Sequence, residues 1–394
     1  MSKRLTIPSL MLANFVNFIP QLIPSLLLIE IAGSFNIEVG VAGQLFTTQS
    51  VVSAIMALLM GILSVRYRHK LLLLAGLTFL GVAALGCAIV PTFSLLLVVF
   101  AFTGISFVMV MPTSQALVGS IFPVHERPKI LGYLIAGFAL SYVIGSPIIS
   151  LIGDWRLAFS LFMFPLTLGS LFLLFVGIPS VARTVPTSQR YIQGFTEVVR
   201  NKSAFTCLVA NVLFYIANRV WGFFSIPFYR QQFLVDTVST SLLVTGSSLI
   251  FVVSSLIGGR LVNRLGRKPL TVLCSLLSGF LYIVFINVSN LWLSILLMYA
   301  AGVTTSLRGT AYNSLALEQI PGYRGTMMSL SQFAQNVAGA LGTTLGGILL
   351  ITFDYGHLGI LSITAIIAAI VIQLFTIDPI TQRTALHSDE MTQI

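Results

Sequence analysis

Two arginines lie inside long apolar segments, where an ionisable side chain is unusual. Arg219 stands in AFTCLVANVLFYIANRVWGFFSIPFYR and Arg308 in AAGVTTSLRGTAYNSLALEQ. A charged group is costly in hydrocarbon, so each arginine is a candidate for binding a solute or gating its path. Arg219 lies about 25 Å along its predicted helix from Lys202, too deep to reach the nearer interface easily. We expect the two arginines to lie at different depths, and they need not contact one ligand together.

Each arginine also has a structural interpretation. Arg219 could extend to the outer interface or pair within the protein. Arg308 could pair with a helix-end carbonyl or with Glu318. The sequence leaves both interpretations open.

Amides mark one face of the first apolar segment, and the pattern returns half the chain later. Asn14, Asn17 and Gln21 are spaced by three and four residues, which places them on one helical face, and Asn211 and Asn218 repeat that face. Amides can hydrogen-bond a solute without titrating, but they can equally join helices through bonds worth about 0.6 kcal/mol. We expect these amides to line a solute path, together with the aromatic residues Tyr215, Trp221 and Tyr312.

Acidic groups are scarce in the same segments. Glu30 ends the first segment, about 35 Å from its start, and Glu318 lies near the opposite interface. Proton coupling usually uses a carboxylate whose pKa is raised by burial, so Glu30 is the candidate proton carrier. The alternative is an ordinary hydrated carboxylate at the interface. Arginines without a fixed acid would suit a solute with negative charge, and a neutral solute fits equally well.

The chain lacks the residue patterns that enzymes and ATP-driven pumps need. No G-x-x-x-x-G-K-[ST] phosphate loop occurs, and the 11 acids and four histidines are scattered rather than clustered. Cys87, Cys207 and Cys274 are odd in number and all lie in apolar runs, against a disulfide framework or metal site. We therefore expect no enzyme activity, no catalytic residue, no metal and no cofactor.

The elements that must position these residues are membrane-spanning helices. Only 8% of the residues are charged, the mean hydropathy is +0.98, and a soluble surface needs roughly 25% charged residues. Each span needs about 20 apolar residues. We predict an all-α membrane protein with about twelve transmembrane helices, at 7–31, 41–64, 71–90, 95–122, 130–152, 157–178, 204–228, 241–262, 269–288, 291–317, 326–351 and 358–376.

Charge and repetition give the predicted topology. Most of the 21 basic residues fall in alternate loops, so that side is cytoplasmic and both termini are inside a cell membrane; nucleic acid is not an expected partner. GILSVRYRHK (61–70) aligns with GRLVNRLGRK (259–268) at an offset of 198, as duplication of a six-helix unit predicts. The predicted parts are an N-terminal six-helix bundle (1–178), a cytoplasmic linker (179–203), a C-terminal six-helix bundle (204–376) and a disordered cytoplasmic tail (377–394). In the linker, Ile192, Phe195, Val198 and Val199 predict an amphipathic helix along the membrane surface.

Three stretches resemble the major facilitator superfamily. GGRLVNRLGRKPL (258–270) is similar to its loop signature, roughly G-x-L-x-D-R-x-G-R-K, with Asn263 in place of the aspartate. Asp154-Trp155-Arg156 and the segment 324–347 also resemble elements of that family. The resemblance implies a conformational-switch role for the matching loop residues Gly259, Arg264, Gly266, Arg267 and Lys268, and for their first-half counterparts Gly61, Arg66 and Lys70.

The resemblance also implies a function. Members of this family bind a small molecule near the middle of the bilayer and expose it to alternate sides, with the first, fourth, seventh and tenth helices lining the path. We expect a monomeric secondary transporter whose partners are a small-molecule solute, the lipid bilayer and, as a candidate coupling ion, protons. Proton-coupled efflux of drugs or metabolites is the preferred interpretation. The alternatives are an exchanger or uniporter of organic anions or sugar-like solutes, and a membrane sensor that transports nothing.

Overall fold

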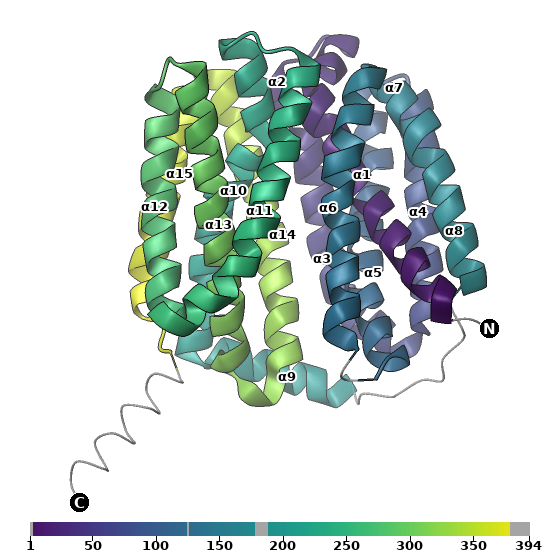
Figure 1. Ribbon diagram of the computed structural model, residues 1–394, viewed down its shortest axis with the longest axis vertical. Helices are drawn as coiled ribbons and strands as arrows, with labels where there is room; N and C mark the ends of the chain where they lie inside the picture. The colour runs from purple at the N-terminus through teal and green to yellow at the C-terminus, as the bar shows by residue number, and fades with distance from the viewer. Residues whose placement is uncertain (1–2, 124–125, 178–187, 379–394) are drawn as a thin grey trace, which may run out of the picture. The chain divides into compact units, whose positions relative to one another are not determined.

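The protein folds as a helical bundle in the computed structural model, which describes residues 3–123, 126–177 and 188–378 (Figure 1). Within these ranges all regular structure is helical, and twelve helices are long and apolar enough to cross a membrane. The predicted all-α fold with about twelve spans is therefore confirmed. The predicted tail beyond 378 and the first part of the predicted linker lie outside the described residues.

The helices of the first half begin and end within a few residues of their predicted bounds. The second span differs, because a short helix, α2, ends at Gly43 before α3 begins. The sixth span is also composite, since a π-helical turn joins α7 to α8. The elements are α1 Lys3–Ser34, α2 Val39–Ala42, α3 Gln44–Arg66, α4 His69–Ile89, α5 Phe93–Ile121, α6 Arg127–Ile152, α7 Trp155–Leu157, the π-turn Ala158–Met163 and α8 Phe164–Gly177.

The second half repeats this order after one extra helix, α9. Its third and fourth spans, α12 and α13, begin and end 198 residues after α4 and α5, so the duplication seen in the sequence extends to helix length. The elements are α9 Ser188–Arg200, α10 Lys202–Gln232, α11 Thr237–Leu265, α12 Arg267–Asn287, α13 Leu291–Gln319, a 3-10 turn at Pro321–Tyr323, α14 Arg324–Thr352 and α15 Tyr355–Leu374.

The helices pack into two compact units. Unit 1 comprises Met1–Thr187, Gly222–Ser248 and Gly339–Phe353, and unit 2 comprises Ser188–Trp221, Leu249–Ala338 and Asp354–Ile394. Three helices, α10, α11 and α14, therefore contribute one part to each unit. Because packing rather than chain order defines these units, the domain boundaries predicted from the sequence stay predictions.

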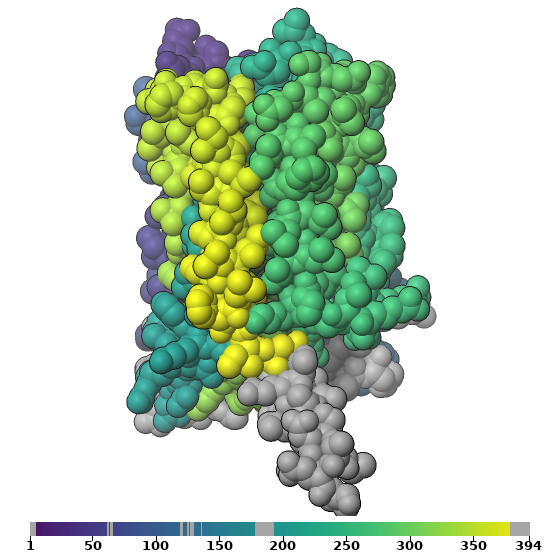
Figure 2. Space-filling view, turned by 90° about the vertical axis from the view of Figure 1, so that its left-hand side faces the viewer, coloured from purple at the N-terminus to yellow at the C-terminus, as the bar shows by residue number. Residues whose placement is uncertain are grey.

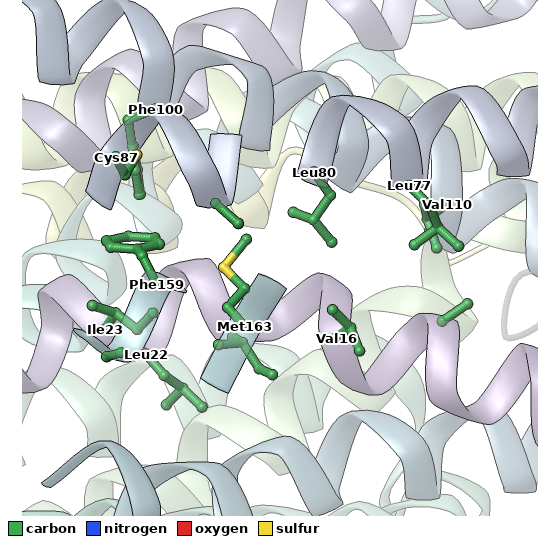
Figure 3. Close-up of a cluster of buried hydrophobic side chains, with 14 of the residues drawn as sticks. Val16, Leu22, Ile23, Leu77, Leu80, Cys87, Phe100, Val110, Phe159 and Met163 are labelled. Carbon is green, nitrogen blue, oxygen red and sulfur yellow. The ribbon is translucent and has the colours of Figure 1, made fainter. Parts of the chain in front are cut away.

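Unit 1 contains a large cluster of buried apolar side chains. Figure 3 shows Phe159 and Met163 lying between side chains of α1 and side chains of α4 and α5. Helices in lipid gain little from the hydrophobic effect, so close van der Waals packing of such side chains holds them together. The labelled members of the cluster are all inaccessible or nearly so: Val16, Leu22, Ile23, Leu77, Leu80, Cys87, Phe100, Val110, Phe159 and Met163.

Unit 2 presents a broad apolar surface on its outer helices. Figure 2 shows α15, in yellow, lying along the green helices of the same unit, and α15 packs against α12. Large apolar side chains project outward from both helices, which suits contact with lipid tails rather than water. They include Leu276 and Phe280 of α12 and Ile360, Ile367 and Val371 of α15, each more than half exposed.

Two polar contacts appear in duplicate. The Nζ of Lys70 donates to the Phe175 carbonyl at the end of α8, and the Nζ of Lys268 donates to the Leu374 carbonyl at the end of α15, each at 2.8 Å. A cation is favourable beside the unpaired carbonyls at a helix C-terminus. The N-termini of the corresponding elements match as well, because Asp154 caps α7 and Asp354 caps α15.

The helix predicted in the linker forms as α9, within unit 2. Gly194 lies close against Thr326 and Tyr323, and Val198 is buried in a cluster with Leu315 and Met327 of the same unit. Phe195 and Val199 are exposed, at 41% and 45%. The apolar residues of α9 thus face in two directions, Val198 into unit 2 and Phe195 and Val199 outward. That the outward face lies along the membrane stays a prediction.

Candidate functional site

Arg308 is the centre of a polar cluster inside unit 2. It lies on α13 with 1% of its surface exposed, although it is among the largest side chains of the chain. Its Nε donates to the Ser275 hydroxyl of α12 at 3.1 Å, and its Nη1 donates to the Asn211 carbonyl oxygen of α10, also at 3.1 Å. Three helices therefore hold one guanidinium in a fixed orientation.

Aromatic faces supply the rest of its surroundings. The guanidinium carbon lies 3.6 Å from the centroid of Phe214, 5.5 Å from that of Tyr312 and 5.9 Å from that of Tyr215. The negative face of an aromatic ring attracts a cation, by about 2 kcal/mol when both are desolvated. The rings thus lower the free-energy cost of burying the charge of Arg308 among neutral hydrogen-bond acceptors.

Arg308 has no carboxylate as a partner among the described residues. Its predicted alternative partner, Glu318, instead forms an ion pair with Arg324 at 3.0 Å, at the C-terminal end of α13. A pairing of Arg308 with Glu318 is therefore wrong, because the carboxylate is engaged by the arginine that begins α14. The hydrogen-bond partners of Arg308 among the described residues, Ser275 and Asn211, are neutral.

Arg219 lies near this cluster, half-buried on α10. Its guanidinium carbon is 6.0 Å from the centroid of Tyr215, the same ring that approaches Arg308. We expected the two arginines to lie at different depths; they share one aromatic neighbour. In unit 2, therefore, two cations of the predicted solute path both lie near the ring of Tyr215.

The other predicted residues of unit 2 pack inward. The Nδ2 of Asn218 donates to the Tyr282 hydroxyl at 3.4 Å, and Trp221 donates to the Ser362 hydroxyl at 2.9 Å. Tyr312 is inaccessible, and its hydroxyl lies 3.0 Å from that of Ser331. Trp221 and Tyr312 thus join helices, whereas Tyr215 and Asn218 keep partly exposed surface.

The amides of α1 are enclosed in unit 1. Asn14 donates to the Leu10 carbonyl of its own helix at 2.8 Å, and the Asn17 carbonyl oxygen accepts from Ser106 of α5 at 2.9 Å. Both are buried, at 3% and 1% exposure, while Gln21 is half-buried. These contacts favour the packing interpretation for Asn14 and Asn17, and a solute contact for them stays a prediction.

A second group of contacts joins the two halves of the sequence within unit 1. A Cβ built on Gly40 would lie 2.5 Å from the Gly347 carbonyl oxygen, so only glycine permits this approach of α2 and α14. The hydroxyls of Thr47 and Thr343 lie 2.8 Å apart beside it. We call these contacts, with the ion pair described next, the closure contacts.

The ion pair joins Glu30 of α1 to Arg230 of α10. The two Nη atoms donate to the two carboxylate oxygens at 2.8 and 2.6 Å, and Nη1 also donates to the Leu26 carbonyl at 3.2 Å. That carbonyl adjoins Leu27, where the backbone of α1 departs from helical values shortly after Pro24. The candidate proton carrier is therefore a partly buried member of a bidentate pair, with its role in coupling still a prediction.

The two predicted switch loops lie at helix junctions. Gly266 has φ +84°, a conformation that favours glycine, between α11 and α12. Nothing lies within 4 Å of a Cβ built on Gly259, and Gly61 falls within α3. Lys70 and Lys268 make the duplicated contacts above, Arg66 and Arg264 are exposed, and Arg267 is half-buried. Their part in switching stays a prediction.

Sequence reasoning missed several residues of both groups. Ser275 and Phe214 complete the Arg308 cluster, but a serine and a phenylalanine in apolar helices carry no local signal. Arg230 lies 200 residues from Glu30 in the sequence, so neither residue indicates the pair. Gly40 and Gly347 lie far apart in sequence, so their approach was not predictable from either one.

Comparisons with known proteins agree with this architecture. The family model described as Major Facilitator Superfamily matches residues 10–238 and 208–391. The chain is 24% identical over 375 residues to the uncharacterized MFS-type transporter YwfA of Bacillus subtilis (strain 168), covering 90% of this chain and 88% of that protein. It is 25% identical over 356 residues to a probable sugar efflux transporter of Helicobacter pylori (strain ATCC 700392 / 26695), covering 88% of this chain and 89% of that protein.

Solved structures show the same fold. The crystal structure of a D-xylose-proton symporter aligns with a TM-score of 0.76 at 15% identity, covering 96% of this chain and 99% of that one. At this identity the similarity concerns the arrangement of helices and not the solute. The family points to a transporter rather than an enzyme.

Proposed function

This chain belongs to the Major Facilitator Superfamily, and we propose that it moves a small solute across the cell membrane by alternating access. Transport by a multi-pass membrane protein follows from the family; the mechanism is our proposal. The observation that supports it is the set of closure contacts, which join α1, α2 and α3 to α10 and α14. They are one close approach of two glycines, one hydroxyl pair and one ion pair.

We infer that these contacts close the outer end of the path. The basic loops lie at the opposite ends of the helices, and lysine and arginine tend to be retained in the cytoplasm, which supports our proposal that both termini are inside. Single cysteines test this orientation in a chain freed of its native cysteines. A membrane-impermeant maleimide should label Trp292→Cys in intact cells and Tyr67→Cys only after permeabilisation, both positions being exposed. The reverse pattern would overturn the orientation.

Cross-linking tests alternating access itself. In the same cysteine-free chain, a disulfide between Thr47→Cys and Thr343→Cys should stop transport, and a reductant should restore it, because the closure contacts could no longer separate. The matched control is Ser278→Cys with Thr304→Cys, whose hydroxyls also lie 2.8 Å apart but join two helices of the second half. Full transport through the cross-linked Thr47–Thr343 variant would contradict the proposal.

We further propose proton-coupled efflux, with Glu30 as the proton-binding group. Protonation of Glu30 would remove its charge and with it both charge-assisted bonds to Arg230, which links the proton to the closure contacts. The printed name of the Helicobacter pylori relative, a probable sugar efflux transporter, favours export as the direction. We also propose that the chain acts as a monomer.

The coupling experiment uses inverted vesicles with an imposed pH gradient and labelled D-xylose, benzoate and a lipophilic dye as probes. Gradient-driven accumulation should disappear in Glu30→Gln. It should persist in Glu318→Gln, which breaks the comparable but more exposed pair with Arg324. Accumulation that ignores the pH gradient in the parent chain would instead establish an exchanger or uniporter, and the anionic or sugar-like solute would then be preferred.

A further inference from the structure

One charge and one hydrogen-bond donor of the Arg308 cluster have no matching partner among the residues that the structure describes. Arg308 is buried without a carboxylate partner among the described residues. Beside it, Asn211 gives its carbonyl oxygen to Arg308 and leaves its buried Nδ2 without a hydrogen-bond partner among the described residues. Both groups stay donors at any physiological pH, since guanidinium does not deprotonate and an amide does not titrate.

The charge of the cluster also favours a bound anion. A buried charge is costly unless it is paired, and a buried polar group left without a hydrogen bond is also costly. The faces of Phe214, Tyr215 and Tyr312 offset part of the cost through cation–π attraction, but they carry no net negative charge. An oxyanion would satisfy the charge of Arg308 and the Nδ2 of Asn211 together.

A purely structural arginine is the competing interpretation. It would account for the bonds to Ser275 and Asn211, which join α13 to α12 and α10. It would not account for the orphan amide nitrogen of Asn211, or for a second cation, Arg219, whose guanidinium carbon lies 6.0 Å from the centroid of the Tyr215 ring. Tyr215 is also partly exposed.

We propose that Arg308 and Asn211 form an oxyanion site, so that the transported solute carries a carboxylate or a phosphate group. Arg308 binds the oxyanion, the Nδ2 of Asn211 donates to it, and the nearby charge of Arg219 attracts it. The aromatic rings at the site suit a solute whose body is planar or apolar. This assignment rests on the proposed function, because it names the class of solute that such a transporter would move.

Thermal unfolding of the purified full chain in detergent tests the site without a transport assay. The probes are benzoate, phenyl phosphate and inorganic phosphate, with benzyl alcohol as the neutral counterpart of benzoate, at constant ionic strength. Binding to the folded state alone raises the unfolding temperature by mass action. We expect benzoate or phenyl phosphate to stabilise the chain, and benzyl alcohol not to. A response to benzoate alone identifies a carboxylate site, and one to both phosphates identifies a phosphate site.

Two variants then assign the response to the cluster. Arg308→Met replaces a buried charge with an apolar chain of comparable length, a change that proteins commonly tolerate, and should raise the apparent Kd at least about tenfold. Asn211→Asp places a carboxylate beside the guanidinium; it should raise the unfolding temperature without any probe and abolish the response to oxyanions. Arg200→Gln, on the exposed face of α9, should leave the response unchanged.

Each outcome decides between the interpretations. Equal stabilisation of the parent chain and of both cluster variants would place the anion elsewhere and overturn the site. No stabilisation of the parent chain by any of the three oxyanions would also overturn it. Transport of D-xylose by alternating access would then leave the proposed function standing, whereas failure of the cross-linking experiment would remove that function and leave a measured oxyanion site intact.

Discussion

The first helix of each half, α1 and α10, places an amide at the same position and uses it differently. Asn14 and Asn211 correspond across the duplication, and both are buried. Asn14 bonds only to the backbone of its own helix, whereas Asn211 bonds to a guanidinium from another helix. The corresponding amides thus bond to a backbone carbonyl in the first half and to a charged side chain in the second.

The residues around the two amides explain this difference. The counterparts of Arg308 and Arg219 in the first half are Val110 and Leu22, which belong to the apolar core of unit 1 (Figure 3). Duplicated helices therefore share lengths and end contacts but not interior chemistry. The first half has apolar side chains at the two positions where the second half has arginines.

Placing an arginine at Val110, the first-half counterpart of Arg308, should have the largest effect on folding. Val110→Arg would bury a guanidinium in the apolar cluster of unit 1, at a cost of several kcal/mol. We expect loss of folded, monodisperse protein in size-exclusion chromatography. Val110→Ala, which removes only two methyl groups, should retain the fold. Normal yield of the arginine variant would mean that unit 1 tolerates charge as well as unit 2.

Removing the two amides in turn should give unequal losses. Asn211→Ala leaves the Nη1 of buried Arg308 without its acceptor and should cost about 1–3 kcal/mol of stability. Asn14→Ala removes a bond to a backbone carbonyl and should cost about 0.6 kcal/mol. Denaturant unfolding in mild detergent would measure both. Equal losses would show that the Arg308 bond contributes no more than a local helix bond.

The duplicated lysines should behave alike. Lys70→Ala and Lys268→Ala each remove a cation that contacts the C-terminal end of another helix, α8 or α15. Such a contact stabilises the fold by about 0.3–1 kcal/mol. We expect similar falls in unfolding temperature, with Lys→Arg variants of both keeping most of the stability. A markedly greater fall for one lysine would show that the halves differ at their ends as well as in their interiors.

The smallest expected effect on stability concerns Asp354, which caps α15. A hydrogen bond with the His357 side chain, followed by one from the His357 backbone, lowers the pKa of Asp354 below its ordinary value. A carboxyl whose pKa is lower in the folded state stabilises the fold above its unfolded pKa, and this contribution is lost as the pH falls through the folded pKa. Asp354 is 74% exposed, so screening by solvent keeps the effect small. Unfolding temperature between pH 6 and 3 should fall less in Asp354→Asn than in the parent chain.

Local patterns predicted the helices and the amphipathic α9 well, because hydrophobic length and helical spacing are properties of adjacent residues. They also selected Arg219, Arg308 and Asn211, since a charge or amide in an apolar run is visible without a fold. They could not distinguish Asn14 from Asn211, which look the same in sequence. That distinction depends on whether the neighbouring helix brings an arginine or a valine.

Apolar segments, a repeated pattern and arginines in apolar runs are visible in the amino-acid sequence, and they predict about twelve membrane spans, duplicated halves and unusual interior cations. The partners of the charged groups are known only from the folded chain: Glu318 with Arg324, Glu30 with Arg230, and Arg308 with Asn211 and the ring of Phe214. The two kinds of information differ because the underlying interactions differ in range. Transfer into lipid acts on each segment separately, whereas ion pairs, cation–π contacts and glycine approaches act over a few ångströms between helices that are remote in the chain.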